Sequence, residues 1–263
     1  MILSRDRILT THVGSLPRNE TLSNLLMSQE AGESYDKQLM DNELNKAVRH
    51  VVDEQKKAGI DIGNDGEQQR VGFQTYIPQR MSGFGGVSQR RRGKEFEEFP
   101  ELVAYLMRRF PHMTKGQQGA PEAQKEIRYL DTKPLENEIA RFKKITGEAK
   151  AFSEQFMTAP SPGIISSTML NAYYDSHEAY LDAIAREMRN EYQTIHKAGL
   201  LVQIDAPDLA MDRTMLFRDL SDAEFVKKCE LHVAAINKGI EGIPHDRVRL
   251  HICYGNWEGP HIH

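Results

Sequence analysis

The sequence repeats one short plan at two distant places. Residues 57–65 read KAGIDIGND and residues 197–205 read KAGLLVQID. Each copy has a Gly suited to the end of a helix, then a short apolar run, and an Asp eight positions after the Lys. Helices that alternate with short apolar strands are typical of folds in which helices cover a parallel sheet. The plan therefore predicts an α/β chain.

Apolar residues spaced by three and four predict the helices of this plan. One stripe precedes Gly199 and a second precedes Gly59. A third helix begins at Ser221, because Ser221 and Glu224 have the spacing of a capping box. A further helix is predicted over 134–144. The strands are predicted at 8–13, 60–65, 127–130, 156–158, 200–205 and 248–253. Six strands, most of them followed by helices, favour a parallel sheet.

The pattern is interrupted between about residues 68 and 124. This segment has glycines at 83, 85 and 86, a run of charges and a second Gly-rich stretch near residue 116. We interpret it as a long insertion with a hairpin on the C-terminal side of the second strand. In a (βα)₈ barrel that side carries the active site, so the insertion is either a lid or substrate wall, or a surface excursion.

Composition excludes several classes of protein. The chain is 39% hydrophobic and 27% charged, with a formal net charge of -4 and a pI near 6.2. These values are typical of a soluble globular protein and argue against nucleic acid or a membrane surface as the main partner. Only Cys229 and Cys253 are present, and Cys229 lies on an apolar helix face, so no disulfide framework is expected. With no long apolar stretch or leader, a cytoplasmic protein is predicted.

Polar residues follow four of the predicted strands at their carboxyl ends. In a parallel α/β fold these ends converge, so side chains far apart in sequence would face one pocket. A single Asp at such an end is also a common helix cap. Four ends that carry imidazole, carboxylate and thiol groups favour an enzyme. These residues are His12, Ser15, Asp65, Glu67, Asp205, Asp208, His251 and Cys253.

His251 and Cys253 have the spacing of two metal ligands on one strand. Side chains at i and i+2 of a strand point to the same face, so an imidazole and a thiol can reach one ion together. A tetrahedral Zn²⁺ takes about four such ligands. The pattern His-x-Cys is short enough to occur by chance, so the pair predicts at most half of a zinc site.

Four segments resemble the catalytic barrel of the cobalamin-independent methionine synthase family, in its short single-barrel form. They are THVGSLPR at 11–18, DIGNDGEQQR at 61–70, VQIDAPDL at 202–209 and LHICYGN at 250–256. They occur in the family's order over nearly the whole chain. The resemblance implies a TIM (βα)₈ barrel of the uroporphyrinogen decarboxylase and methionine synthase type. It also implies a methyltransferase of methionine biosynthesis, in which Zn²⁺ activates the thiol of homocysteine.

The resemblance assigns roles to individual residues. His251 and Cys253 match the first two ligands of the family's His, Cys, Glu and Cys zinc set. Ser15 matches the residue that holds the carboxylate of the amino acid, and Glu67 and Asp205 match the acids that receive its ammonium group. Three further candidates for substrate contact or catalysis are His12, Asp208 and Asn256.

Three departures from the family pattern limit these expectations. Ala206 replaces the acidic residue that follows the Asp of the family's IDEP motif. The family's extra N-terminal barrel has no counterpart here, so the methyl donor is open between methyltetrahydrofolate and a corrinoid-bound methyl group. The chain also stops after the sixth predicted strand, before the remaining zinc ligands. We therefore expect residues 1–263 to form one barrel domain that is incomplete at its C-terminus, completed by further sequence or covered in an oligomer.

Alternative functions follow from the same features. Another zinc thiol alkyltransferase, such as an epoxyalkane:coenzyme M transferase, would share the thiolate step and differ in the electrophile. A metal-free decarboxylase of the uroporphyrinogen type would share the fold but leave the His-x-Cys pair without a role. A non-catalytic barrel remnant is the third alternative.

Overall fold

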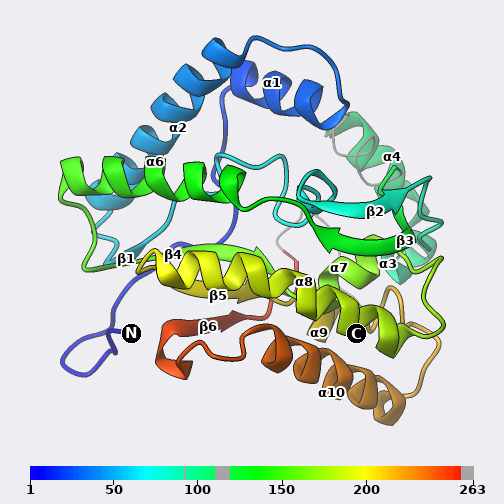
Figure 1. Cartoon of the computed structure of the whole chain (residues 1–263). Coiled ribbons are helices and arrows are strands. Elements are labelled where there is room, and N and C mark those ends of the chain that lie inside the picture. The colour runs from blue at the N-terminus through cyan, green and yellow to red at the C-terminus, as the bar shows by residue number, and fades with distance from the viewer. Residues whose placement is uncertain (92, 110–118, 256–263) are drawn as a thin grey trace.

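The computed structural model describes residues 1–91, 93–109 and 119–255. Strands and helices alternate through most of this range (Figure 1). The strands are β1 (Ile62–Gly63), β2 (Met81–Gly85), β3 (Glu122–Tyr129), β4 (Glu154–Pro160), β5 (Leu201–Asp205) and β6 (Val248–His251). The α-helices are α1 (Glu20–Glu30), α2 (Lys37–Lys57), α3 (Lys94–Glu98), α4 (Pro100–Arg109), α6 (Lys133–Ala149), α7 (Pro162–Thr168), α8 (His177–Lys197), α9 (Asp208–Met211) and α10 (Asp222–Gly239). Two short 3₁₀ helices are η1 (Ile77–Gln79) and η2 (His245–Arg247).

The main sheet is parallel and has the strand order β1-β4-β5-β6 among the described residues. Pro160 of β4 pairs with Asp205 of β5, which in turn pairs with His251 of β6. The carboxyl ends of these three strands are thus in register along one edge. The predicted α/β fold with a parallel sheet is confirmed, whereas the described strands form an open sheet, so the closed (βα)₈ barrel stays a prediction.

The helices end and begin where the sequence indicates. Both α2 and α8 stop just before a glycine with positive φ, 74° at Gly59 and 84° at Gly199. This left-handed conformation reverses the chain at low cost only when no Cβ is present. At the start of α10, Ser221 caps the backbone N–H of Glu224 and the Glu224 carboxylate accepts from Ser221 in return. The capping box is therefore confirmed.

The core lies between the sheet and the helices that cover it. All of β5 is buried, and α8 packs against β4, β5 and α10 (Figure 1). Tyr180 and Tyr192 of α8 are fully buried and donate their hydroxyls to the backbone oxygens of Met169 and Pro160, both at 2.7 Å. Cys229, predicted to be a core residue, is only half-buried.

The predicted strand at 8–13 is wrong. The structure contains a single parallel bridge there, between Thr11 and Ile62, and the side chain of Ile8 is 83% exposed. The segment is held instead by the carboxylate of Asp61, which pairs with Arg7 and accepts the backbone N–H of Thr10 at 2.8 Å. Two backbone N–H groups, of Asp61 and Ile62, also donate to the oxygen of Thr10, at 3.2 and 3.1 Å, so the segment is attached at one point rather than by a continuous ladder along β1.

The predicted strand at 127–130 belongs to β3, outside the parallel sheet. β3 pairs antiparallel with β2, and the register shifts between Ser82 and Phe84. Only Ala123 and Ile127 of β3 are buried, as expected for a two-stranded ribbon with one covered face. The prediction of six parallel strands is wrong for this reason, while the hairpin expected in the insertion is present and extends beyond residue 124.

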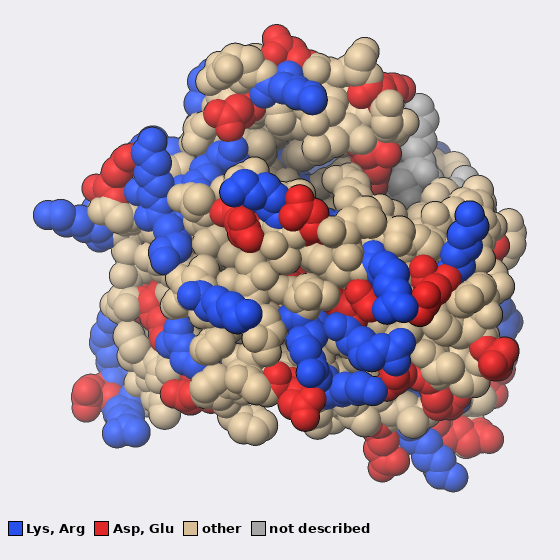
Figure 2. Space-filling model, in the orientation of Figure 1, with Lys and Arg blue, Asp and Glu red and all other residues tan. Residues whose placement is uncertain are grey.

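Opposite charges are interspersed on the molecular face seen in Figure 2. Blue Lys and Arg side chains lie beside red Asp and Glu side chains over most of that face, without a continuous basic surface among the residues drawn in colour. None of the helices in the described ranges is both long and apolar enough to cross a lipid bilayer.

Candidate functional site

Two carboxylates are buried together at the carboxyl edge of the parallel sheet. Glu67 follows β1, Asp205 is the last residue of β5, and the two residues are only 2% and 5% exposed. Thr158 of β4, the strand between them, donates its hydroxyl to Oε1 of Glu67 at 3.4 Å. The strand order thus brings two acids from distant parts of the chain to one place.

The electrostatics of this acid pair, Glu67 and Asp205, are unfavourable in isolation. Burial, followed by the nearby charge of Glu67, raises the pKa of Asp205 to about 7. Burial also raises the pKa of Glu67, although the hydroxyl of Ser15 and the charge of Arg70 oppose this rise. Two buried carboxylates with raised pKa values are stabilised by a cation placed between or beside them.

Ser15 lies at the solvent side of the acid pair. Ser15 is exposed, and its hydroxyl donates to Oε2 of buried Glu67. Glu67 itself has a φ of 56°, which is uncommon for a residue other than glycine. Such strained residues are concentrated at binding and catalytic sites, because the surrounding structure must hold them there.

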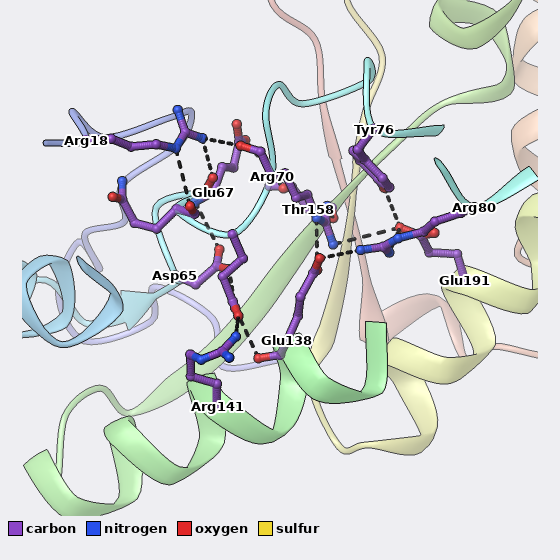
Figure 3. A network of polar contacts seen from close by, with 12 residues as sticks. Arg18, Asp65, Glu67, Arg70, Tyr76, Arg80, Glu138, Arg141, Thr158 and Glu191 are labelled. Atoms are coloured by element: carbon purple, nitrogen blue, oxygen red, sulfur yellow. Dashed lines mark hydrogen bonds and ion pairs between the residues drawn. The ribbon is translucent and has the colours of Figure 1, made fainter. Parts of the chain in front are cut away.

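A compensated ionic network lies next to Glu67 (Figure 3). The guanidinium of Arg70 contacts Glu138 at 3.1 Å and donates to the backbone oxygen of Thr158 at 2.7 Å. The guanidinium of Arg80 pairs with Glu138 and lies 3.2 Å from Glu191. Burial raises the pKa of Glu191, but Arg80 and Arg70 outweigh this effect and lower it. Each buried charge therefore has an opposite partner.

Two tyrosines complete this Arg–Glu network. The ring of Tyr76 lies 4.4 Å from the guanidinium carbon of Arg70 and 4.5 Å from that of Arg80. Its hydroxyl donates to Glu191, as does the hydroxyl of Tyr129 at 2.8 Å. The network therefore connects the loop after β1, the β2–β3 hairpin and helices α6 and α8.

His251 is the last residue of β6, and Cys253 lies two residues beyond the end of this strand. His251 pairs in register with Asp205, and both His251 and Cys253 are half-buried, whereas the intervening Ile252 and the following Tyr254 are exposed. Burial and then the charge of Arg249 lower the pKa of His251, which favours a neutral imidazole. Exposure thus alternates from His251 to Tyr254, although the strand itself ends at His251.

The donor set for a metal is incomplete within the described ranges. One imidazole and one thiol are of the types that Zn²⁺ prefers, but residues 1–91, 93–109 and 119–255 contain no group of three or more His, Cys, Asp or Glu placed to hold an ion. Asn256 lies outside the described residues. A role for His251 and Cys253 as zinc ligands stays a prediction.

The other predicted site residues have partners of their own. Asp208 is fully buried, and its two carboxylate oxygens contact the hydroxyl of Ser161 at 2.5 Å and Nδ1 of His232 at 2.8 Å. His232 in turn lies 3.0 Å from His177 through their Nε2 atoms. The ring of His12 lies 2.9 Å from the oxygen of Gly14 in its own loop. A role for Asp208 or His12 in substrate contact stays a prediction.

Sequence reasoning missed several residues around the acid pair. Arg18 and Arg70 belong to the SLPR and EQQR segments, but nothing in their spacing showed that Arg18 contacts the loop of Glu67 or that the charge of Arg70 acts on its carboxylate. The apolar pattern predicts Thr158 only as part of a strand. The available signal was the position of each residue at a strand end or within a motif.

The chain has recognisable relatives. Residues 8–94 match the family model described as the catalytic domain of cobalamin-independent synthase. The resemblance to the cobalamin-independent methionine synthase family is confirmed. Proteins called methionine synthase from Saccharolobus solfataricus and Sulfolobus acidocaldarius are 25% and 24% identical over 250 and 257 residues. These alignments cover 94% and 96% of this chain but only 63% and 64% of the relatives, so the chain spans just under two thirds of their length.

Solved structures of this family share the fold. A B12-independent methionine synthase from Shewanella sp. W3-18-1, in complex with selenomethionine, superposes with a TM-score of 0.65 at 20% identity. The superposition covers 94% of this chain and 61% of that one. A putative vitamin-B12 independent methionine synthase from Listeria monocytogenes gives a TM-score of 0.62 at 18% identity, with 94% and 67% covered. At this identity the likeness concerns the fold alone.

Proposed function

We propose that this chain carries the amino-acid site of an enzyme that transfers a methyl group to the thiol of homocysteine or a similar amino acid. The observation that carries the proposal is the acid pair, Glu67 and Asp205, at the carboxyl edge of the sheet. The likeness to methionine synthases supports the same reaction class. The donor is a methylated folate or a corrinoid-bound methyl group.

The acid pair favours an amino acid over coenzyme M as the thiol substrate. An α-ammonium group would neutralise two buried carboxylates that otherwise repel each other, and charge-assisted hydrogen bonds would fix its orientation. Coenzyme M has no ammonium group and carries a sulfonate, which the same carboxylates would repel. The epoxyalkane:coenzyme M transferase alternative is therefore disfavoured by the electrostatics of this edge.

The reaction needs a thiolate held in line with the methyl donor. The sulfur attacks the methyl carbon, a new S–C bond forms, and the bond between methyl and donor breaks with its electron pair staying on the donor. The thiol proton is lost to solvent before attack. Glu67, Asp205 and Ser15 would bind the ammonium and carboxylate ends of the amino acid, which fixes the sulfur's direction and lowers the entropy cost of reaction.

Zinc is a separate part of the proposal. His251 and Cys253 would supply two of its ligands, and residues beyond the described ranges would supply the others. A bound Zn²⁺ would lower the pKa of a coordinated thiol well below its ordinary value of ~8.5. No other part of the proposal depends on how the ion is held.

The test measures amino-acid recognition and methyl transfer separately. Calorimetry compares binding of L-homocysteine, 4-mercaptobutyrate, which lacks the ammonium group, and coenzyme M. Methionine formation is then assayed with methyltetrahydrofolate and with methylcobalamin, with zinc content measured in wild type and Cys253→Ser. We expect homocysteine to bind and the other two thiols not to bind. Asp205→Asn should weaken the binding of homocysteine about 30-fold or more, because a buried charge pair is lost.

Some results would contradict the proposal. Equal affinities for homocysteine and 4-mercaptobutyrate would show that the acid pair does not recognise an ammonium group. Tight binding of coenzyme M, with product formed from epoxypropane, would favour the alkyltransferase alternative. Methyl transfer at full rate without zinc would remove the metal from the proposal and leave the amino-acid site in place.

A further inference from the structure

The loop that carries Glu67 is held against the segment before α1. Residues 64–70 follow β1, and residues 12–18 lie alongside them. The backbone N–H of Leu16 donates to the oxygen of Gly66 at 3.0 Å. A Cβ built on Gly66 would come within 3.0 Å of the side chain of Leu16, so the two segments are in close contact.

One side chain closes this contact. The guanidinium of Arg18 donates to three backbone oxygens of the loop, from Nη2 to Glu67, from Nε to Gln68 at 3.3 Å and from Nη2 to Arg70 at 2.6 Å. Figure 3 shows Arg18 at one end of the polar network, beside Glu67. The planar guanidinium can reach several acceptors in fixed directions, which a single ammonium cannot do.

The loop needs such a partner for two reasons. Gly66 and Glu67 are both left-handed, with φ of 61° and 56°, and this conformation is unfavourable for Glu67. The carbonyls of three nearby residues also point toward one place, where their dipoles repel unless a cation lies between them. The charge of Arg18 helps in a further way, because it opposes the effect of burial on the pKa of Glu67.

Arg18 is itself placed by the start of α1. The next residue, Asn19, caps this helix by accepting the N–H of Leu22 at 2.8 Å, and its side-chain amide donates to Glu43 of α2 at 2.9 Å. The residue that follows Arg18 is therefore held by two helices, in addition to the contacts that its segment makes with the loop.

We propose that Arg18 is a positioning residue that clamps the loop of residues 64–70, so that the carboxylate of Glu67 stays beside Asp205 in the amino-acid site. The identity of the ligand rests on the proposed function, whereas the clamp rests on the contacts of Arg18 alone. Arg18 acts through the backbone of the loop and does not touch the substrate.

The test compares conservative substitutions of two arginines that contact the same loop from outside it. Arg18→Lys keeps the positive charge but removes the planar guanidinium that donates to several acceptors in fixed directions. Arg141→Lys is the matched control, because Arg141 donates to the side chain of Gln69 at 2.5 Å rather than to a backbone oxygen of the loop. Hydrogen exchange of the 64–70 backbone is measured in both variants and in wild type. Calorimetry with L-homocysteine, and KM and kcat for methionine formation, follow on the same preparations.

We expect faster exchange confined to residues 64–70 in Arg18→Lys, with homocysteine bound about ten- to a hundredfold more weakly. KM should rise by a similar factor while kcat changes by less than about threefold, because the reacting atoms keep their partners. Arg141→Lys should behave as wild type.

Each contrary result has a distinct meaning. Unchanged exchange in Arg18→Lys would overturn the clamp, whatever the enzyme does. Altered exchange with unchanged homocysteine affinity would overturn the positioning role. If wild type does not bind homocysteine, the proposed function fails, and the exchange measurement by itself decides whether the clamp exists.

Discussion

Two buried ionic clusters lie side by side in this protein and differ in how their charges are balanced. In the Arg–Glu network, Arg70 and Arg80 face Glu138 and Glu191, and each charge has an opposite partner. The acid pair is close by, but the described residues place no equivalent cation between its carboxylates, and the pKa of Asp205 is about 7.

The difference indicates what each cluster does. A buried charge costs several kcal/mol unless it is paired, so a balanced network is compatible with a role in holding elements together. An unbalanced pair is kept at a cost to stability, and such sites are frequently places where a ligand supplies the missing charge. The following predictions test whether the two clusters differ in this way.

The largest effect is expected in the Arg–Glu network. Glu191→Gln should lower the free energy of unfolding by about 3–5 kcal/mol, because two buried guanidiniums lose their partner. Urea unfolding at pH 7 measures it. Glu148→Gln is the control, since Glu148 pairs with Arg49 at a site where both side chains are 47% exposed. Similar small shifts in both variants would show that the network is no more important than a surface ion pair.

In the acid pair, replacing a carboxylate should raise the free energy of unfolding at neutral pH rather than lower it. The pKa of Asp205 is raised from 3.8 to about 7 in the folded protein, so the folded state binds this proton more tightly than the unfolded chain does. The contribution of this protonation to the free energy of unfolding is fully present below about pH 4 and is lost as the pH rises to about 7. Asp205→Asn removes this loss, so its stability relative to wild type should increase between pH 4 and pH 8 by up to about 4 kcal/mol. Urea unfolding at both pH values measures the gain. A variant destabilised at pH 8 would show that Asp205 is already compensated.

The smallest effect is expected at Ser15. Ser15→Ala removes a hydrogen bond to Glu67, so homocysteine should bind about fivefold more weakly, equivalent to about 1 kcal/mol. Because the Ser15 hydroxyl lowers the pKa of Glu67, its loss should also move the acidic limit of binding to higher pH. Calorimetry from pH 5.5 to 8 measures both. Ser23→Ala, at a serine whose hydroxyl donates to the oxygen of Asn19 in its own helix, is the control, and an identical pH profile for the two variants would contradict the prediction.

Local patterns predicted local structure well. The glycines after α2 and α8 and the capping box at Ser221 act through neighbouring residues, so their effect is readable in a short window. Residues 8–13 and 127–130 have the apolar character of strands, but their pairing depends on Asp61 and on β2, which are distant in sequence. A short apolar run does not by itself predict which strand it will pair with.

In the candidate site, too, the sequence predicted some features and the structure alone showed others. Glu67, Asp205, His251 and Cys253 could be named from their positions after strands and from the motifs around them, because a parallel sheet brings its carboxyl ends together. The sequence did not predict how deeply Glu67 and Asp205 are buried, the strained backbone of Glu67 or the contacts of Arg18.

The sequence by itself determined the alternation of helices and strands, the helix ends and the residue types at the strand ends, since these depend on backbone preferences and side-chain spacing over a few residues. The tertiary structure alone decided which buried charges are paired and which are not. That balance depends on distances between side chains from separate elements and on the exclusion of water around them, and neither quantity exists until the chain has folded.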